Sequence, residues 1–187
     1  MAKPLPSSSS SSVPEPLQKM LSPTATISDD IPLQYASQAL GFLKDISFSA
    51  VVPDHCKSND FYSNLIGGVL KPLTISRGRV SCLLTVKPAV TNYFLGLHGG
   101  AVAAVAEAIS IACARTVVAE DTEIFLGELS MSYLSGAPLN SEVIVDGNVV
   151  RSGRNITVIS VDFKLKKTSK LVFTARATFY NMPVAKL

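Results

Sequence analysis

A glutamate inside an apolar stretch, and two glycines at the start of that stretch, are the residues best suited to do chemistry in this 187-residue chain. The stretch reads LHGGAVAAVAEAISIACA over residues 97–114, and Glu107 is its one carboxylate. A run this apolar predicts a helix that is buried on nearly every side. Because burial disfavours the charged form of a carboxyl group, we expect a raised pKa for Glu107, which suits a general base or nucleophile at neutral pH.

The glycine pair offers a second chemical group. The first N–H groups of a helix have no partner within the helix, and Gly99 and Gly100 have no side chains that would keep a substrate carbonyl away from them. An amide that binds a developing oxyanion contributes about 3–4 kcal/mol in other hydrolases. Together with Glu107, these amides favour thioester hydrolysis, because a thiolate leaves without a strong general acid. Two structural alternatives remain open: close helix–sheet packing for the glycines, and a hydrogen-bonded structural acid for Glu107.

The helical repeat places these groups on different sides. At about 100° per residue, the nine-residue step from His98 to Glu107 turns the helix roughly halfway round. One helix therefore does not easily direct both Gly99 and Glu107 at one carbonyl, whereas two antiparallel copies related by a two-fold axis do so. The sequence predicts an active site shared across a dimer. The expected assembly is a homodimer or a homotetramer made of two such dimers.

The rest of the chain predicts elements that surround this helix. Alternating and helical apolar patterns indicate helices at 33–43 and 53–65, strands at 68–76 and 79–86, a loop at 87–97, the central helix at 99–118, and strands at 124–134, 142–150, 156–166 and 171–180. Arg77-Gly78 is a hairpin turn signal between the first two strands. An antiparallel sheet wrapped around one long helix, an α+β architecture, is the simplest way to bury both.

This order resembles the hotdog fold, and more closely the acyl-CoA thioesterases related to 4-hydroxybenzoyl-CoA and phenylacetyl-CoA thioesterases. The resemblance covers roughly residues 54–181. It rests on quoted motifs: Thr91-Asn92 six residues before the histidine, Leu97-His98-Gly99-Gly100, an acid nine residues after His98, Tyr133-x-Ser135, and the turn Arg151-Ser-Gly-Arg154.

In that family the corresponding acid is catalytic, which implies a catalytic role for Glu107 here. The resemblance also implies that the Gly99 amide polarises the thioester carbonyl and that Asn92 positions a water or the carboxylate, although Asn92 is also a common turn residue. His98 is implied to be a positioning residue, and packing of the loop is its alternative role. Gly100 is expected to help bind the substrate.

The group that holds the attacking water is less certain from the resemblance. Some relatives have a hydroxyl four residues after the acid, where this chain has Ile111. Ser110 lies one position earlier and is a candidate substrate-binding residue. In another branch a serine of the following strand holds the water, and Leu126 occupies that position here.

Candidates to bind the phosphates of coenzyme A lie around the last hairpins: Arg151, Arg154, Lys164, Lys166 and Lys167. No cofactor or metal is required by the proposed chemistry, and His55-Cys56 has no second cluster to complete a metal site. A net charge of +3 and the absence of basic runs interleaved with aromatics argue against nucleic acid as a partner. Glu107 and Arg115 interrupt the apolar run, so we expect a helix inside a globular domain and no membrane span.

The two ends of the chain carry other signals. Residues 1–35 are Ser/Pro-rich and predicted to be disordered, with an organelle transit peptide as the alternative, and residues 36–187 are expected to form the hotdog domain. Three well-separated cysteines fit free thiols in a reducing compartment. The final Ala185-Lys186-Leu187 resembles a Ser-Lys-Leu-type peroxisomal signal, and plastid, mitochondrion and cytosol are the alternatives.

The function predicted from the sequence is hydrolysis of a fatty or aromatic acyl-CoA to the free acid and coenzyme A. Glutamate as the acid is typical of the aroyl-CoA members of the resembled family, which favours an aromatic acyl group. The alternative is a non-catalytic hotdog subunit that binds acyl-CoA or serves in assembly. A hydratase or dehydratase is disfavoured because a second well-placed acid or a nearby histidine for double-bond chemistry is lacking.

Overall fold

The computed structural model describes residues 27–28, 31–45 and 54–183, and the chain divides into two units, Met1–Val52 and Pro53–Leu187. Helix α2 (Leu33–Asp45) belongs to the first unit and covers the helix predicted at 33–43. The domain boundary expected after residue 35 falls inside this helix. The predicted disorder of residues 1–35 falls mostly outside the described residues, and so does the C-terminal tripeptide.

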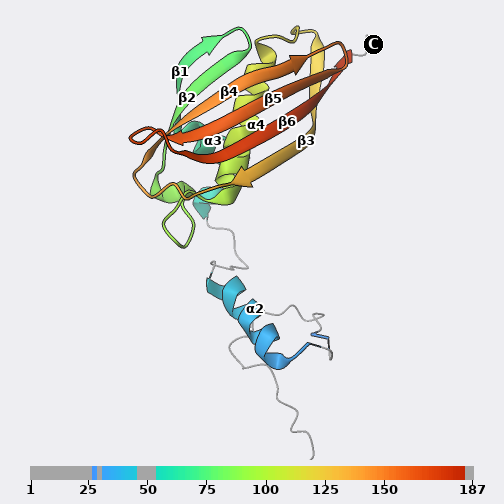
Figure 1. The fold of residues 1–187 in the computed structure, drawn as a ribbon. Helices are drawn as coiled ribbons and strands as arrows, with labels where there is room; N and C mark the ends of the chain where they lie inside the picture. Colours follow the sequence, from blue (N-terminus) through green and yellow to red (C-terminus); the bar gives the residue numbers. More distant parts are fainter. Residues whose placement is uncertain (1–26, 29–30, 46–53, 184–187) are drawn as a thin grey trace, which may run out of the picture. The chain divides into compact units, whose positions relative to one another are not determined.

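The second unit contains one six-stranded antiparallel sheet and one long helix, which confirms the predicted α+β class. The strands lie in the order β1-β2-β4-β5-β6-β3. Along the chain the elements are η1 (Asp54–Cys56), α3 (Phe61–Gly67), β1 (Leu70–Ser76), β2 (Arg79–Thr85), η2 (Pro88–Val90), α4 (Gly99–Arg115), β3 (Thr122–Tyr133), β4 (Glu142–Ser152), β5 (Ile156–Leu165) and β6 (Leu171–Pro183). Figure 1 shows α4 lying against one face of the sheet.

The core lies between α4 and the sheet face that packs against it. The strands that form this face alternate between buried and more exposed positions. On β5, for example, Ile159, Val161 and Phe163 are fully buried while the residues between them are only partly buried. On α4 the matching residues are Val102 and Val105, both with no exposed surface. This alternation is the period-2 pattern that the sequence predicted for strands.

The β1–β2 hairpin holds the end of α4. Arg77-Gly78 forms the predicted turn, and Gly78 adopts a left-handed backbone with φ of 77°, which glycine tolerates without a steric penalty. The Gly78 N–H donates to the Thr116 hydroxyl at 2.8 Å, and the Cys113 thiol donates to the Gly78 carbonyl at 3.4 Å. These contacts fix the last turn of α4 beside the hairpin.

Several predicted boundaries differ from the structure. The single helix predicted at 53–65 is a 3₁₀ turn, η1, followed by the separate helix α3, because the intervening Lys-Ser-Asn-Asp consists largely of turn-forming residues. Residue 53 itself lies outside the described residues. Helix α4 ends at Arg115, three residues earlier than predicted, where Arg115 Nη1 donates to the Thr122 carbonyl at 2.7 Å.

The prediction that α4 is buried on nearly every side is wrong for the single chain. Its buried residues lie on one face, and an opposite face made of Gly100, Glu107, Ala108, Ile111, Ala112 and Arg115 is exposed. The sequence did not distinguish the two faces because alanine, a strong helix former, occupies both. None of the helices in the described part of the chain is long and apolar enough to cross a membrane.

Gly147 on β4 allows α4 to approach the sheet closely. A Cβ atom at Gly147 would lie 2.7 Å from Cγ2 of Ile109, which is itself packed in the core. We predict that Gly147→Ala lowers the free energy of unfolding by about 1–3 kcal/mol, because a well-packed core must shift to accept the methyl group. Urea denaturation monitored by circular dichroism measures this change.

Gly136→Ala is the matched control, since a Cβ atom there meets nothing within 4 Å. Its free energy of unfolding should stay within about 0.5 kcal/mol of the wild-type value. Equal stability of the two variants would show that the close contact at Gly147 does not exist in solution.

Candidate active site

The loop before α4 is held by Asn92. Its side-chain Oδ1 accepts from the Phe94 N–H at 3.0 Å and from the Gly96 N–H at 3.1 Å. Its backbone N–H donates to the Gly96 carbonyl at 2.8 Å. Leu95, between these donors, adopts a left-handed backbone with φ of 59°. These contacts match the turn role that sequence reasoning left open for Asn92. Its predicted role in positioning a water or a carboxylate stays a prediction.

His98 caps the first turn of α4. Its Nδ1 accepts from the Gly100 N–H at 2.9 Å, and its backbone N–H donates to the Val90 carbonyl at 2.9 Å. An accepting Nδ1 is unprotonated, so a neutral ring carries its proton on Nε2. His98 therefore contacts the helix through its ring and the incoming loop through its backbone, and its implied positioning role stays a prediction.

This cap leaves the two glycine amides in different states. The Gly100 N–H is occupied by His98, whereas the Gly99 N–H has no hydrogen-bond partner among the described residues. Gly99 lines a cavity of about 510 Å³ that Asn92, Tyr133, Ser135 and Phe173 also line. The structure thus leaves Gly99 as the amide of the predicted pair that is free to bind a substrate oxygen.

Two tyrosines contact the same helical turn through its carbonyl groups. The Tyr133 hydroxyl donates to the Gly99 carbonyl at 3.1 Å, and the Tyr62 hydroxyl donates to the Gly100 carbonyl at 3.3 Å. A Cβ atom at Gly99 would lie 3.5 Å from the Tyr133 ring, an ordinary contact. The contact with Tyr133 therefore does not by itself require glycine at position 99.

Glu107 lines a second cavity, of about 410 Å³, between α3, β1 and α4. Its neighbours there are Tyr62, Ser63, Ile66, Gly67, Leu70, Ala104 and Ala108, most of them apolar. The carboxylate is exposed and forms no hydrogen bond or ion pair with the described residues. The buried setting expected for Glu107 is therefore wrong for the single chain, because α4 turns this residue away from the sheet.

The Gly99 and Glu107 cavities share no lining residue. Eight residues of helix also separate the two groups by about 12 Å along its axis. One thioester carbonyl does not reach both groups of the same chain. This separation agrees with the geometric argument made from the sequence.

The expected water-holding positions fall on different faces. Ser110 is fully buried, and its Oγ has no hydrogen-bond partner among the described residues, so the structure does not place this hydroxyl where a substrate reaches it. Ile111 is exposed on the same face as Glu107, and Leu126 packs against the core. Ser63 also lines the Glu107 cavity, and the sequence did not single it out.

The arginines and lysines proposed for coenzyme A phosphates lie at opposite ends of the sheet. Arg151 and Arg154 are exposed at the β4–β5 hairpin, where the Asn181 N–H donates to the Asn155 carbonyl near the start of β3. Tyr133, at the other end of β3, is the residue that contacts Gly99. Lys166 and Lys167, in the β5–β6 hairpin, lie at this second end. Among the residues described, no group of three or more His, Cys, Asp or Glu could hold a metal ion.

Residues 96–172 match the family model described as the Thioesterase superfamily. Over these residues the chain is similar to that superfamily. The match includes Gly99, Glu107, Tyr133 and both hairpin arginines, and it leaves out Asn92 and helix α3. The match therefore bears out the resemblance that the sequence motifs indicated, and with it the prediction of a thioester hydrolase at the level of the reaction class.

Similar proteins extend the likeness beyond the residues that the family model matches. Human acyl-coenzyme A thioesterase 13 is 26% identical over 132 residues, which cover 71% of this chain and 92% of the relative. Thioesterase superfamily member 2 of zebra fish has a TM-score of 0.61 at 20% identity and covers 78% of this chain and 96% of its own. The protein smu.793 of Streptococcus mutans, bound to acetyl CoA, has a TM-score of 0.57 at 21% identity and covers 63% of this chain and 91% of its own. The solved structures support the predicted hotdog fold.

Proposed function

We propose that this chain hydrolyses an acyl-CoA thioester to the free acid and coenzyme A in an active site shared by two protomers. In each site, Gly99 of one protomer binds the thioester carbonyl and Glu107 of the other drives the attack. The observation that carries this proposal is that the two groups lie in separate cavities of one chain, about 12 Å apart along α4. The match to the Thioesterase superfamily model supports the reaction class.

The chemistry follows from the free amide and the carboxylate. The Gly99 N–H polarises the carbonyl and stabilises the oxyanion that forms when the carbon is attacked. Glu107 either removes a proton from the attacking water or attacks the carbon itself to form an anhydride that water then opens. In both routes the C–S bond breaks and the thiolate leaves. In the first route the new acid retains the oxygen from water, and in the second route water hydrolyses the anhydride to the free acid and the regenerated Glu107 carboxylate. Ser63 lines the same cavity as Glu107, and we propose that its hydroxyl helps to hold the water.

The exposed face of α4 supports the shared site. Ala108, Ile111 and Ala112 expose small or apolar side chains on either side of Glu107. An antiparallel copy of α4 packed on this face would cover these residues and bring the partner's helix N-terminus toward Glu107. The proposed assembly is accordingly a homodimer, or a homotetramer made of two such dimers.

The substrate class rests on relatives and on cavity chemistry. Human acyl-coenzyme A thioesterase 13 carries acyl-CoA in its name, and the Streptococcus mutans protein was solved with acetyl CoA. In this chain the cavity beside Glu107 is lined mainly by apolar residues such as Ile66 and Leu70, which suit a fatty or aromatic acyl group. Arg151 and Arg154 of the β4–β5 hairpin stay the proposed contacts for the phosphates of coenzyme A.

We predict that Glu107→Gln lowers the rate of acyl-CoA hydrolysis by about 10²–10⁴-fold, because the amide neither accepts a proton from water nor attacks the carbonyl. Release of free thiol from a panel of acyl-CoAs measures the rate. The melting temperature should not change, because the carboxylate is exposed and forms no hydrogen bond or ion pair with the described residues. Glu120→Gln, an exposed charge-matched substitution in the α4–β3 loop, should keep wild-type activity.

A Glu107→Gln protein with full activity would contradict the assigned role of the carboxylate. Tight acyl-CoA binding with no thiol release from the wild-type protein would instead favour the alternative of a non-catalytic binding or assembly subunit.

We also propose that the final Ala185-Lys186-Leu187 directs import into peroxisomes, on its similarity to a Ser-Lys-Leu-type signal. A fluorescent protein fused to the N-terminus, which leaves Leu187 free, should accumulate in punctate organelles that contain a peroxisomal marker. Removing the tripeptide should make the signal diffuse. Import into plastids or mitochondria, or a distribution that ignores the loss of the tripeptide, would contradict the assignment.

A further inference from the structure

We infer that the acyl group of the substrate is a long fatty chain, which leaves the Glu107 cavity and lies along one face of β1 as far as Ile75. Three apolar residues of β1 carry this inference, and together they are named the β1 strip: Leu70, Pro72 and Ile75. The inference rests on the proposed function and goes beyond it by choosing between a fatty and an aromatic acyl group. Both α3 and β1 lie outside residues 96–172, which the family model matches.

The β1 strip lies on the sheet face that packs against α4. Its members pair with three buried residues of β2, which belong to the core: Leu84, Cys82 and Val80. Directly paired residues share one face of a sheet. Leu70 and Ile75 are five positions apart and would face opposite sides on a regular strand. A β-bulge between Pro72 and Thr74 adds one residue and thereby turns Ile75 to the inner face.

The far end of the β1 strip is left uncovered by the described residues. Ile75 keeps 68% of its surface exposed, whereas its partner Val80 on the same face keeps 3%. The difference arises because β1 is an edge strand of the sheet. A large apolar side chain left exposed on the inner face is suited to contact with an apolar ligand.

Both ends of β1 are placed beside α4. At one end Leu70 lines the Glu107 cavity together with Ala108. At the other end the hairpin turn contacts the end of α4, where the Gly78 N–H donates to the Thr116 hydroxyl at 2.8 Å. Strand β1 therefore runs beside the second half of α4 in the same direction. The β1 strip begins at the cavity in which the thioester is proposed to react.

The dimensions of the β1 strip suit a linear chain. From Leu70 to Ile75 the strand spans about 15 Å at about 3.3 Å per residue, less the loss at the bulge. An extended alkyl chain covers this length with about twelve carbons, at about 1.3 Å each for C–C bonds of about 1.5 Å. A single aromatic ring would not reach beyond the cavity. One row of side chains is also narrower than the helix of a protein partner, which is about 10 Å across.

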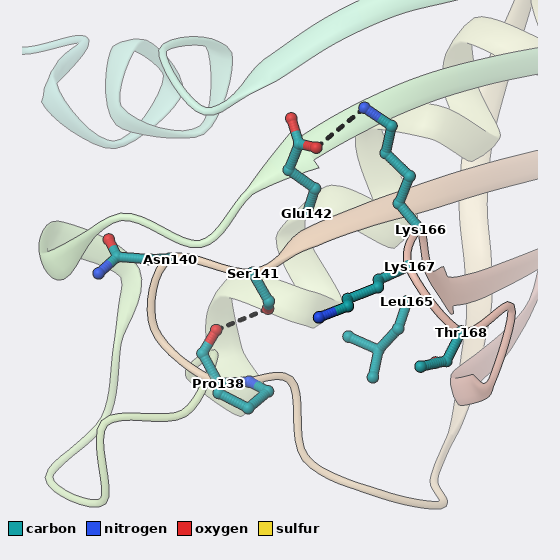
Figure 2. Close-up of a pocket in the computed structure, with 8 residues that line it drawn as sticks. All are labelled: Pro138, Asn140, Ser141, Glu142, Leu165, Lys166, Lys167 and Thr168. Atoms are coloured by element: carbon teal, nitrogen blue, oxygen red, sulfur yellow. Dashed lines mark hydrogen bonds and ion pairs between the residues drawn. The ribbon is translucent and has the colours of Figure 1, made fainter.

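The cavity at the β5–β6 hairpin does not suit an acyl chain. It measures about 590 Å³, and most of its lining residues are polar: Pro138, Asn140, Ser141, Glu142, Leu165, Lys166, Lys167 and Thr168 (Figure 2). Figure 2 shows Lys166 turned toward Glu142, and the two groups form an ion pair of 2.9 Å. Neither Gly99 nor Glu107 lines this cavity. The apolar route that begins at the proposed reacting group is the one along β1.

Calorimetry with two coenzyme A thioethers tests the β1 strip without hydrolysis. S-dodecyl-CoA and S-hexyl-CoA carry an alkyl chain and have no thioester carbonyl that the site could attack. The full chain should bind S-dodecyl-CoA about tenfold more tightly, because each methylene buried along the strip favours binding. Ile75→Asp should weaken S-dodecyl-CoA by about tenfold more than S-hexyl-CoA, because a six-carbon chain ends about 8 Å along the strip.

Thr74→Asp is the matched control, since it adds the same charge at the neighbouring exposed position on the opposite face of β1. It should bind both thioethers like the wild type. Equal affinity of the wild type for the two thioethers, or equal effects of the two aspartate substitutions, would overturn the inference. Sedimentation of the same variants covers a second occupant. Loss of oligomer in Ile75→Asp alone would show that another copy of the chain covers the strip, and this too would overturn the inference.

Hydrolysis separates this inference from the proposed function. Thiol release is measured with dodecanoyl-CoA, hexanoyl-CoA and benzoyl-CoA. The kcat/KM should be highest for dodecanoyl-CoA, and Ile75→Asp should raise the KM of this ester most. A highest kcat/KM for benzoyl-CoA would overturn the inference and still support the proposed hydrolase. Tighter binding of the longer thioether with no thiol release from any ester would count against the proposed function and leave the binding of the chain along β1 standing.

Discussion

The packing of one face of α4 against the core face of the sheet determines where every candidate site residue lies. Gly147 lets the helix approach β4 closely, and Val102 and Val105 fill the space beneath it. Once that face is buried, Glu107 must face away from the sheet, and Ser110 must face into the core. The orientation of one helix thus separates the reactive carboxylate from a hydroxyl only three residues away.

The loop before α4 sets the second half of the site. Asn92 holds the loop through two backbone N–H groups, and His98 occupies the Gly100 amide. These contacts leave the Gly99 N–H free at the entrance of a cavity. The two polar side chains closest to the glycine motif therefore serve the geometry of the amide. In the proposed mechanism the carboxylate that acts with Gly99 comes from the partner chain.

The sequence predicted the elements well and the rotation of the central helix poorly. Strands such as β5 alternate clearly between apolar and polar residues, and Arg77-Gly78 is a turn that glycine makes possible. Residues 97–114, by contrast, are small or apolar on all sides, so their periodicity does not show which face meets the sheet. For this reason burial was wrongly expected for Glu107. The Tyr133 contact to Gly99 joins residues 34 positions apart, which no local pattern reveals.

Mixing two inactive protomers tests the shared active site most directly. One protomer carries Glu107→Ala and keeps Gly99, and the other carries Gly99→Val and keeps Glu107. Random assembly puts about half of the protein into mixed dimers with one intact site each, so the activity should recover to about a quarter of the wild-type value. A mixture no more active than either variant alone, despite demonstrated mixed dimers, would contradict a site built from two chains.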